Sequence, residues 1–376
     1  MKRISRLLAG STLFTAIAIS AGLVAAPAAH ADTSPVQRSV DALVSQDRFP
    51  GVLASVRQPD GRTRNYTAGV ADLRTGAKMP VNGRVRIASN TKMFTATVVL
   101  QLVGEGKVGL DTPVETYLPG VVRGPGIDGR TITVRHLLQQ TSGLLDYDEA
   151  IFADFPEGLN TYYEPYELLR VAFATKPESA PGAKFVYSNT NYILAGLVAQ
   201  KASGRPIGEL ITERIIEPLG LRGMYWPAEG ETTIRGKHPR GYLLADPPVD
   251  ITESDPSPGW SAGALVGRPS DINRFLAGLL GGRLLAPAQL AEMKKTVPAP
   301  GFDTVGGSRY GLGLATFALS CGGFAWTHGG TAFGYVTVVG ITASGKAATV
   351  AVNSMVPNAD ANRRLERSLD IALCRG

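Results

Sequence analysis

Strand-like segments lie at both ends of this chain, and a long helical stretch separates them. Residues 52–57 and 62–70 read as two strands joined by an Asp60-Gly61 turn. Three later runs rich in Val, Tyr and Thr are also typical of strands: 324–327, 335–341 and 347–352. We therefore predict an α+β fold in which both chain ends build one antiparallel β-sheet, with an all-helical lobe inserted between them.

Helices are expected to flank this sheet. Residues 35–46 and 362–374 place apolar side chains at helical spacing, whereas residues 92–103 are apolar nearly all round and predict a buried helix. Further helices are predicted at 133–140, 164–174, 191–201, 207–216 and 269–280. We place the sheet domain at residues 32–110 and 255–376 and the helical lobe at 111–254.

The first 31 residues carry the pattern of a secretory signal peptide. A basic head is followed by an apolar stretch, and Ala29-His30-Ala31 fits the small-x-small cleavage pattern. Residues 1–31 are therefore expected to be removed, which predicts a secreted protein with no stable membrane anchor. An uncleaved anchor is the alternative.

The cysteine, charged and histidine residues indicate which cross-links, partners and cofactors to expect. Cys321 and Cys374 both lie beyond the signal, and an even count in an oxidising compartment predicts one disulfide, with two buried free thiols as the alternative. The net charge of +6 is spread along the chain without a basic run, which argues against nucleic acid as a partner. The three histidines after the signal lack the spacing of metal ligands, so we expect no metal, no cofactor and a monomer.

Ser89 and Lys92 stand where an extended segment meets the predicted buried helix. Side chains three positions apart share a helix face, so the Lys92 amine can manage the proton of the Ser89 hydroxyl. The backbone N–H groups at a helix start suit an oxyanion forming on an acylated Ser89. A serine that only caps the helix is the alternative.

Two further groups of residues accompany this pair. Tyr187 and Asn189 lie in a turn before a predicted helix, and a Lys92 cation beside the Tyr187 phenol would favour its ionised form, so that Tyr187 could take the Ser89 proton. The run His328-Gly329-Gly330-Thr331 leaves a predicted strand at its edge, where the glycines would admit substrate and the Thr331 N–H would complete an oxyanion hole. For His328 we expect a wall of the site and no role as a base.

The order Ser-x-x-Lys, Tyr-x-Asn, His-x-Gly resembles that of the serine β-lactamase and penicillin-binding protein superfamily, in its class C branch. Other segments look similar to those of secreted, soluble D-alanyl-D-alanine carboxypeptidase/transpeptidases, namely 132–138, 141–144, 187–192, 310–314 and 319–322. The resemblance covers nearly the whole mature chain. It implies the two-lobe fold, a Cys321–Cys374 bridge, and Phe152 and Trp260 as aromatic walls of the cleft.

The chain departs from those carboxypeptidases at one place. They hold the carboxylate of the terminal D-alanine with an arginine, assisted by a hydroxyl in a His-Thr-Gly motif. Here the corresponding stretch, Ala315–Ala318, contains no arginine, and Gly329 replaces the threonine. A buried carboxylate without such donors loses about 2–5 kcal/mol of binding. Arg309 or Arg268 is a possible substitute.

These observations predict a secreted serine acyl-enzyme hydrolase. Its leading form is a D-alanyl-D-alanine carboxypeptidase-like enzyme that cleaves peptide amide bonds of D-amino-acid peptides through an acylated Ser89, with a small peptide, ester or β-lactam as substrate. Because the arginine is absent, an esterase, a D-amino-acid amidase or an acyltransferase of the same fold is the alternative. A non-catalytic penicillin binder is a second class, weakened by the presence of both Lys92 and Tyr187.

Overall fold

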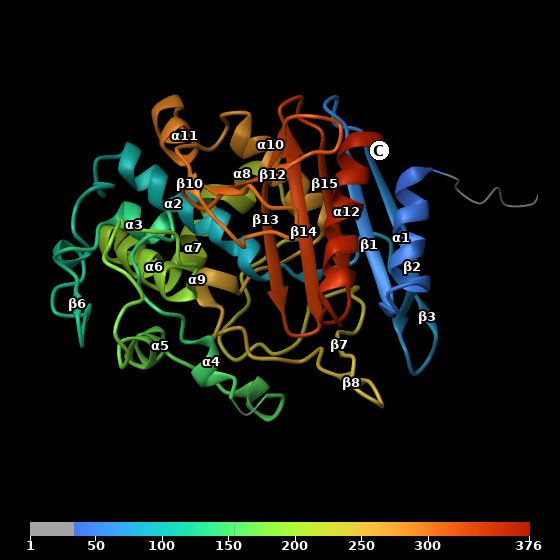
Figure 1. Ribbon diagram of the computed structural model, residues 1–376, viewed down its shortest axis with the longest axis horizontal. Helices are drawn as coiled ribbons and strands as arrows, with labels where there is room; N and C mark the ends of the chain where they lie inside the picture. The colour runs from blue at the N-terminus through green and yellow to red at the C-terminus, as the bar shows by residue number, and fades with distance from the viewer. Residues whose placement is uncertain (1–33, 154) are drawn as a thin grey trace, which may run out of the picture. The chain divides into compact units, whose positions relative to one another are not determined.

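The computed structural model describes residues 34–153 and 155–376, and Ser34–Gly376 form one compact unit (Figure 1). The signal peptide predicted for residues 1–31 lies outside the described residues. Among those that are described, no helix is long and apolar enough to cross a membrane.

A nine-stranded antiparallel sheet organises the unit, as predicted. Its strand order, β10-β11-β12-β13-β14-β15-β1-β2-β3, places strands from the two chain ends side by side. The strands are β1 (Gly51–Arg57), β2 (Thr63–Asp72), β3 (Ala77–Lys78), β10 (Val297–Pro298), β11 (Arg309–Tyr310), β12 (Ala315–Ala318), β13 (Phe324–Ala332), β14 (Tyr335–Thr342) and β15 (Ala347–Val352). The pairs β4 (Val85–Arg86) with β9 (Val266–Gly267), β5 (Arg123–Gly124) with β6 (Ile127–Asp128), and β7 (Tyr242–Leu243) with β8 (Val249–Asp250) lie outside it.

Helices cover both faces of the sheet. The terminal helices α1 (Pro35–Ser45) and α12 (Ala359–Arg375) pack together on one face, and α10 (Pro269–Leu280) packs on the other (Figure 1). Alternate residues of β1 show why both faces need a cover: Val52, Ala54 and Val56 join the core under the terminal helices, whereas Leu53 joins the opposite core. A strand buried on both faces is largely apolar, and in β1 the polar residues are Ser55 and the terminal Arg57.

A single apolar core continues from the α10 face of the sheet into the helical part of the chain. At its centre lies α2 (Thr91–Gly104), the predicted all-round apolar helix, whose Phe94 stacks on Phe275 of α10 with ring centroids 3.7 Å apart. The helices that pack against α2 are α6 (Asn189–Ser203), α7 (Ile207–Ile211), α9 (Trp260–Gly263) and α11 (Pro287–Met293). The same part of the chain contains α3 (Val134–Leu138), α4 (Asp148–Ile151), α5 (Pro165–Ala172) and α8 (Glu217–Leu219). The lobe boundaries at 110 and 255 stay predictions.

The region 111–254, expected to be all-helical, also contains the short strand pairs β5–β6 and β7–β8, because its loops fold back on themselves there. Two single elements differ from the sequence-based expectation as well. The helix expected at 207–216 ends at Ile211 and continues as a π-helical turn over Thr212–Ile216. The strand expected to end at Thr327 runs on to Ala332, because pairing with β14 continues from Ala325↔Thr342 to Ala332↔Tyr335. The run from His328 to Thr331 therefore lies inside β13 rather than at its edge. In the same region, Cys321 and Cys374 are joined by a disulfide that links the β12–β13 turn to α12.

Candidate active site

Ser89 lies in a short 3₁₀ turn, Ala88–Asn90, that joins β4 to α2. The preceding residue, Ala88, has a positive φ of 50°, a conformation that costs a residue with a side chain free energy. No helix-capping hydrogen bond is formed by a side chain of this turn. The capping alternative for Ser89 is thus not supported, and the hydroxyl lines the cavities described below.

Lys92 is fully buried beside this serine. Its Nζ lies 2.9 Å from Ser89 Oγ, 2.5 Å from Asn189 Oδ1 and 3.0 Å from the carbonyl oxygen of Ala262 in α9. Burial lowers the pKa of Lys92 to about 7, against the opposing effect of the carboxylates of Asp146 and Asp148. A substantial fraction of the amine is therefore neutral near pH 7 and able to accept the Ser89 proton.

Tyr187 stands directly before α6, with its ring centroid 5.0 Å from Lys92 Nζ. The expected ionisation of its phenol is wrong: burial raises the pKa of Tyr187 well above its usual value, Tyr310 raises it further, and a hydrogen bond with Ser89 offsets only part of this. Desolvation outweighs the effect of the Lys92 charge, on which that expectation rested. Tyr187 thus remains a phenol that can donate a proton, and the base beside Ser89 is Lys92.

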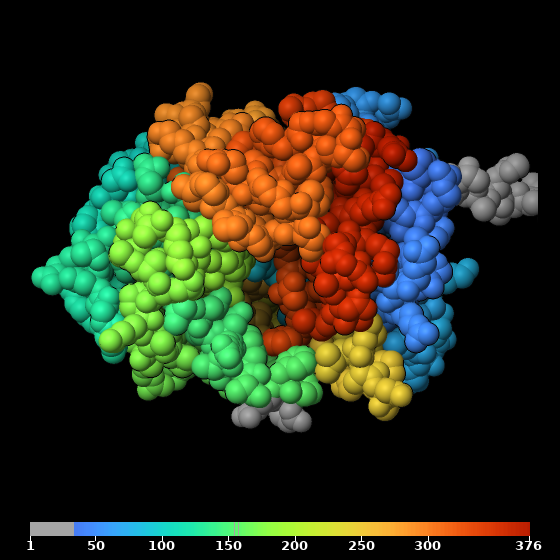
Figure 2. Space-filling view, in the orientation of Figure 1, coloured from blue at the N-terminus to red at the C-terminus, as the bar shows by residue number. Residues whose placement is uncertain are grey.

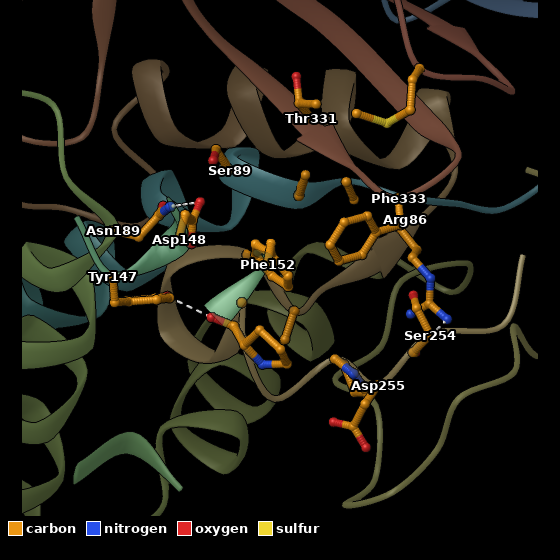
Figure 3. Close-up of a pocket in the computed structure, with 18 residues that line it drawn as sticks. Arg86, Ser89, Tyr147, Asp148, Phe152, Asn189, Ser254, Asp255, Thr331 and Phe333 are labelled. Atoms are coloured by element: carbon orange, nitrogen blue, oxygen red, sulfur yellow. Dashed lines mark hydrogen bonds between the residues drawn. The ribbon is translucent and has the colours of Figure 1, made fainter. Parts of the chain in front are cut away.

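Asn189 connects this pair to two carboxylates that sequence reasoning missed. Its backbone N–H donates to Asp146 Oδ2 at 2.8 Å, and its side-chain Nδ2 donates to Asp148 Oδ2 at 2.7 Å (Figure 3). Burial raises the pKa of Asp148 to about 7, and repulsion from Asp146 adds to this. The two acids follow the Thr141–Leu144 segment of the resemblance directly, so their position along the chain was the available signal.

His328 is a neutral wall of the site. Its Nδ1 donates to the carbonyl of Gly329 at 2.6 Å, which leaves Nε2 to accept from the Tyr310 hydroxyl at 3.0 Å. Burial lowers the pKa of His328 to about 3, and the nearby Lys92 adds to this. Both ring nitrogens are engaged with the protein, in agreement with the expectation that His328 is not a base.

Gly330 marks the closest approach of β13 to the Ser89 turn. A Cβ at this position would lie 2.3 Å from the Ile87 carbonyl oxygen and 2.6 Å from Asn90 Nδ2. At Gly329 the nearest atom to such a Cβ is 3.8 Å away. The absence of a side chain at Gly330 therefore lets Thr331 approach Ser89, whereas a side chain at Gly329 would make only an ordinary contact.

Two cavities meet at Ser89, and Asp148, Asn189 and Thr331 also line both of them. The smaller, of about 250 Å³, lies between Phe152, Phe333 and Pro258 (Figure 3). The larger, of about 710 Å³, is lined by Tyr187, Phe302 and the His328–Thr331 strand. Figure 2 shows the hollow between the green segment around α4 and the orange and red C-terminal part of the chain.

The two expected aromatic walls have different outcomes. Phe152 lines the smaller cavity, where its ring meets that of Phe333 edge to face. Trp260 does not line either cavity at Ser89: it lies in a neighbouring one with Tyr162 and Trp226. The reason is that Trp260 begins α9, and the Ser89 side of this helix is formed by its small residue Gly263 instead.

The two candidate substitutes for the missing arginine lie away from the larger cavity. Arg309, at the end of β11, donates to the Thr296 hydroxyl and backbone carbonyl at 2.9 Å each. Arg268 precedes α10 and packs against Gly223. Neither of them lines either cavity, and the neighbouring strand β12, Ala315–Ala318, contributes no cation.

This combination of a two-sided sheet, a buried central helix and a Ser-Lys-Tyr cluster defines a serine hydrolase-type enzyme. Residues 36–373 match the protein-family profile described as Beta-lactamase. The chain belongs to the beta-lactamase family, which confirms the resemblance noted in its sequence.

Curated relatives and solved structures agree with this assignment. Penicillin-binding protein 4 of Amycolatopsis lactamdurans is 29% identical over 69% of this chain and 69% of its own length. Protein flp of Staphylococcus aureus (strain MW2) is 27% identical over 56% of this chain, which spans only 42% of that relative. The structure of a D-stereospecific amidohydrolase from Streptomyces sp. has a TM-score of 0.80 and 36% identity, covering 89% of this chain and 97% of its own. That of a D-amino acid amidase from Ochrobactrum anthropi SV3, complexed with L-phenylalanine amide, has a TM-score of 0.77 and 27% identity, covering 90% and 96%.

Proposed function

We propose that this protein is a serine amidohydrolase that cleaves amides of D-amino acids through an acylated Ser89, without recognising a C-terminal carboxylate. This was the alternative to the carboxypeptidase reading of the sequence. The observation that carries it is the charge of the larger cavity. Its lining contains the four carboxylates Asp146, Asp148, Glu178 and Glu366, and no Lys or Arg among the described residues.

The chemistry follows from which groups face each cavity. Neutral Lys92 takes the Ser89 proton as Oγ attacks the amide carbon, and the N–H groups of Ser89 and Thr331 stabilise the oxyanion. When the C–N bond breaks, the leaving nitrogen takes a proton from the Tyr187 hydroxyl, which Lys92 then reprotonates. Water attacks the ester in the second half of the reaction, with the same groups working in reverse.

Tyr187 decides which cavity receives the leaving group. Its side chain lines the larger cavity and not the smaller one, so the nitrogen that it protonates lies on the larger side. A C-terminal carboxylate leaving with that nitrogen would face four acidic side chains and no lining Lys or Arg; one of the four, Glu178, is paired with Lys184 at 2.7 Å. A neutral amide or ammonia meets no such repulsion.

The D configuration rests on the structural neighbours. One solved structure named above is described as a D-stereospecific amidohydrolase and the other as a D-amino acid amidase, and each covers about nine-tenths of this chain. The D-stereospecific amidohydrolase is 36% identical in sequence to this chain.

A matched pair of dipeptides tests this proposal. D-Phenylalanyl-D-alanine and its C-terminal amide differ only in the charge of the leaving group, and Ser89→Ala serves as the inactive control. We expect kcat/KM for the amide to exceed that for the free acid by about tenfold or more, equivalent to about 1.4 kcal/mol. A free acid that is cleaved as fast as the amide would contradict the proposal and restore the carboxypeptidase reading.

We propose further that the protein acts outside the cytoplasm after removal of residues 1–31. The basic head, apolar stretch and Ala29-His30-Ala31 pattern support this. N-terminal sequencing of the protein from the culture medium should begin at Asp32. Full-length protein retained inside the cell would contradict it.

A further inference from the structure

Asp148 holds an unusual position beside the nucleophile. It lines both cavities at the point where they meet, together with Ser89 and Asn189. The two cavities divide a bound substrate between an acyl part and a leaving group, so the junction is where the α-carbon substituents of the acyl residue must pass. Asp148 is therefore placed to contact a group on that α-carbon.

One oxygen of this carboxylate is available to a ligand. Oδ2 accepts from Asn189 Nδ2, and within the described part of the chain Oδ1 accepts no hydrogen bond. Asp148 also forms no ion pair there, although Lys92 lies nearby, because the Lys92 amine is directed to Asn189 Oδ1 instead. Asp148 is partly exposed, so this oxygen can accept a hydrogen bond from a cationic ligand and form a direct ion pair with it.

Two ionisable groups act on Asp148 at this end of the smaller cavity: the carboxyl of Asp146 and the amine of Lys92, which is only partly charged near pH 7. Asp146 adds a second carboxylate, which raises the pKa of Asp148 by repulsion. At the opposite end, Asp255 has a cationic neighbour in Arg86, whose guanidinium donates to the backbone carbonyls of Thr232 and Ser254 (Figure 3). The junction at Ser89 thus holds two carboxyl groups against one amine, so it can accept a second cation from a ligand.

The smaller cavity itself suits an apolar side chain. Phe152, Phe333 and Pro258 form its walls. An amino acid with its side chain between these rings and its carbonyl at Ser89 brings its α-nitrogen to the junction.

We infer that Asp148 binds the free α-ammonium group of the acyl residue and so restricts the enzyme to substrates with an unblocked N-terminal D-amino acid. This deepens the proposed function and rests on it. An N-acylated residue has no charge to offer, and its carbonyl oxygen would face Asp148. Internal D-residues, whose nitrogen is part of a peptide bond, are excluded for the same reason.

The test compares D-phenylalanine methyl ester with N-acetyl-D-phenylalanine methyl ester, since esters acylate Ser89 readily whatever the natural leaving group. We expect wild-type kcat/KM to favour the free amine by about 30-fold or more. Asp148→Asn keeps an oxygen that can accept from Asn189 but removes the charge, and should reduce this preference to less than about threefold. Glu149→Gln removes an equal charge from the exposed neighbouring residue and should leave the preference unchanged.

The outcomes separate the inference from the function on which it rests. Equal loss on both esters in Asp148→Asn would overturn the inference, because it would show that Asp148 acts only by holding Asn189. Equal use of both esters by the wild type would overturn it as well, while amide hydrolysis through Ser89 would stand. If neither ester acylates Ser89, the proposed function fails and the inference falls with it.

Discussion

Substituting Gly330 by alanine tests the arrangement of β13 against the nucleophile. The new Cβ would lie 2.3 Å from the Ile87 carbonyl oxygen, whereas ordinary contacts begin at 3.4 Å, so strand and turn must separate by about 1 Å. The Ile87 carbonyl belongs to the backbone and cannot move aside as a flexible side chain does, and the next closest atom, Asn90 Nδ2, is held by hydrogen bonds to that carbonyl and to the Thr337 hydroxyl. The Thr331 N–H on the strand and the Ser89 hydroxyl on the turn would then lie too far apart to act on the same substrate carbonyl.

A displacement of about 1 Å at reacting groups costs on the order of 100-fold in rate, and overpacking of this kind costs about 1–3 kcal/mol of unfolding free energy. Gly329→Ala is the matched control, because its Cβ meets nothing closer than 3.8 Å. Both variants gain the same stabilisation from a less flexible unfolded chain, so their difference isolates the contact with Ile87.

The assay measures the acylation rate with D-phenylalanine methyl ester, alongside thermal unfolding of each variant. We expect Gly330→Ala to lose about 100-fold in rate and to unfold earlier than Gly329→Ala, which should stay within a few-fold of the wild type. Wild-type acylation by a folded Gly330→Ala protein would refute the close fit of β13 against the Ser89 turn.

Three further predictions concern the proton-transferring groups. Lys92→Met should abolish acylation yet raise the melting temperature. Burial lowers the pKa of Lys92 to about 7, so at neutral pH the charged amine reduces the free energy of unfolding, and methionine removes that cost. A melting temperature below that of the wild type would contradict this. The rate of acylation by a neutral N-acetyl ester should increase as pH rises through about 7, since the neutral Lys92 is the base and Tyr187 and His328 do not titrate there. Asp148, whose pKa is also about 7, ionises over the same range and raises the Lys92 pKa, which broadens the increase; a rate that falls over this range would argue against Lys92. Tyr187→Phe should slow hydrolysis of D-phenylalanine amide far more than that of a p-nitrophenyl ester, whose leaving group needs no proton, and an equal loss on both would assign Tyr187 another role.

The fold could be predicted from sequence because its determinants are local patterns. The apolar periods of residues 35–46 and 92–103 and the strand runs at both ends appear as α1, α2 and the central strands of the sheet. Where tertiary pairing decides the outcome, local pattern was insufficient: the two glycines suggested an end to β13, but hydrogen bonding to β14 carries the strand to Ala332.

The nucleophile and its neighbours could also be found from motifs, but their charge states could not. Ser89, Lys92 and Asn189 come together as the spacing indicated. The protonation state of Tyr187 depends on its burial, which cannot be predicted from a motif. Desolvation raises the Tyr187 pKa, whereas the Lys92 charge alone was expected to lower it. Trp260 was assigned to the cleft by resemblance alone, and the orientation of α9 places it in the next cavity.

Covalent capture on Ser89 is the most direct test of the central claim. Acid quenching during turnover of D-phenylalanine methyl ester, followed by peptide mass mapping, should find the phenylalanyl mass on the peptide that contains Ser89. Ser89→Ala should show neither this mass nor turnover. Turnover by Ser89→Ala at the wild-type rate, or the acyl group on a different residue, would contradict the account.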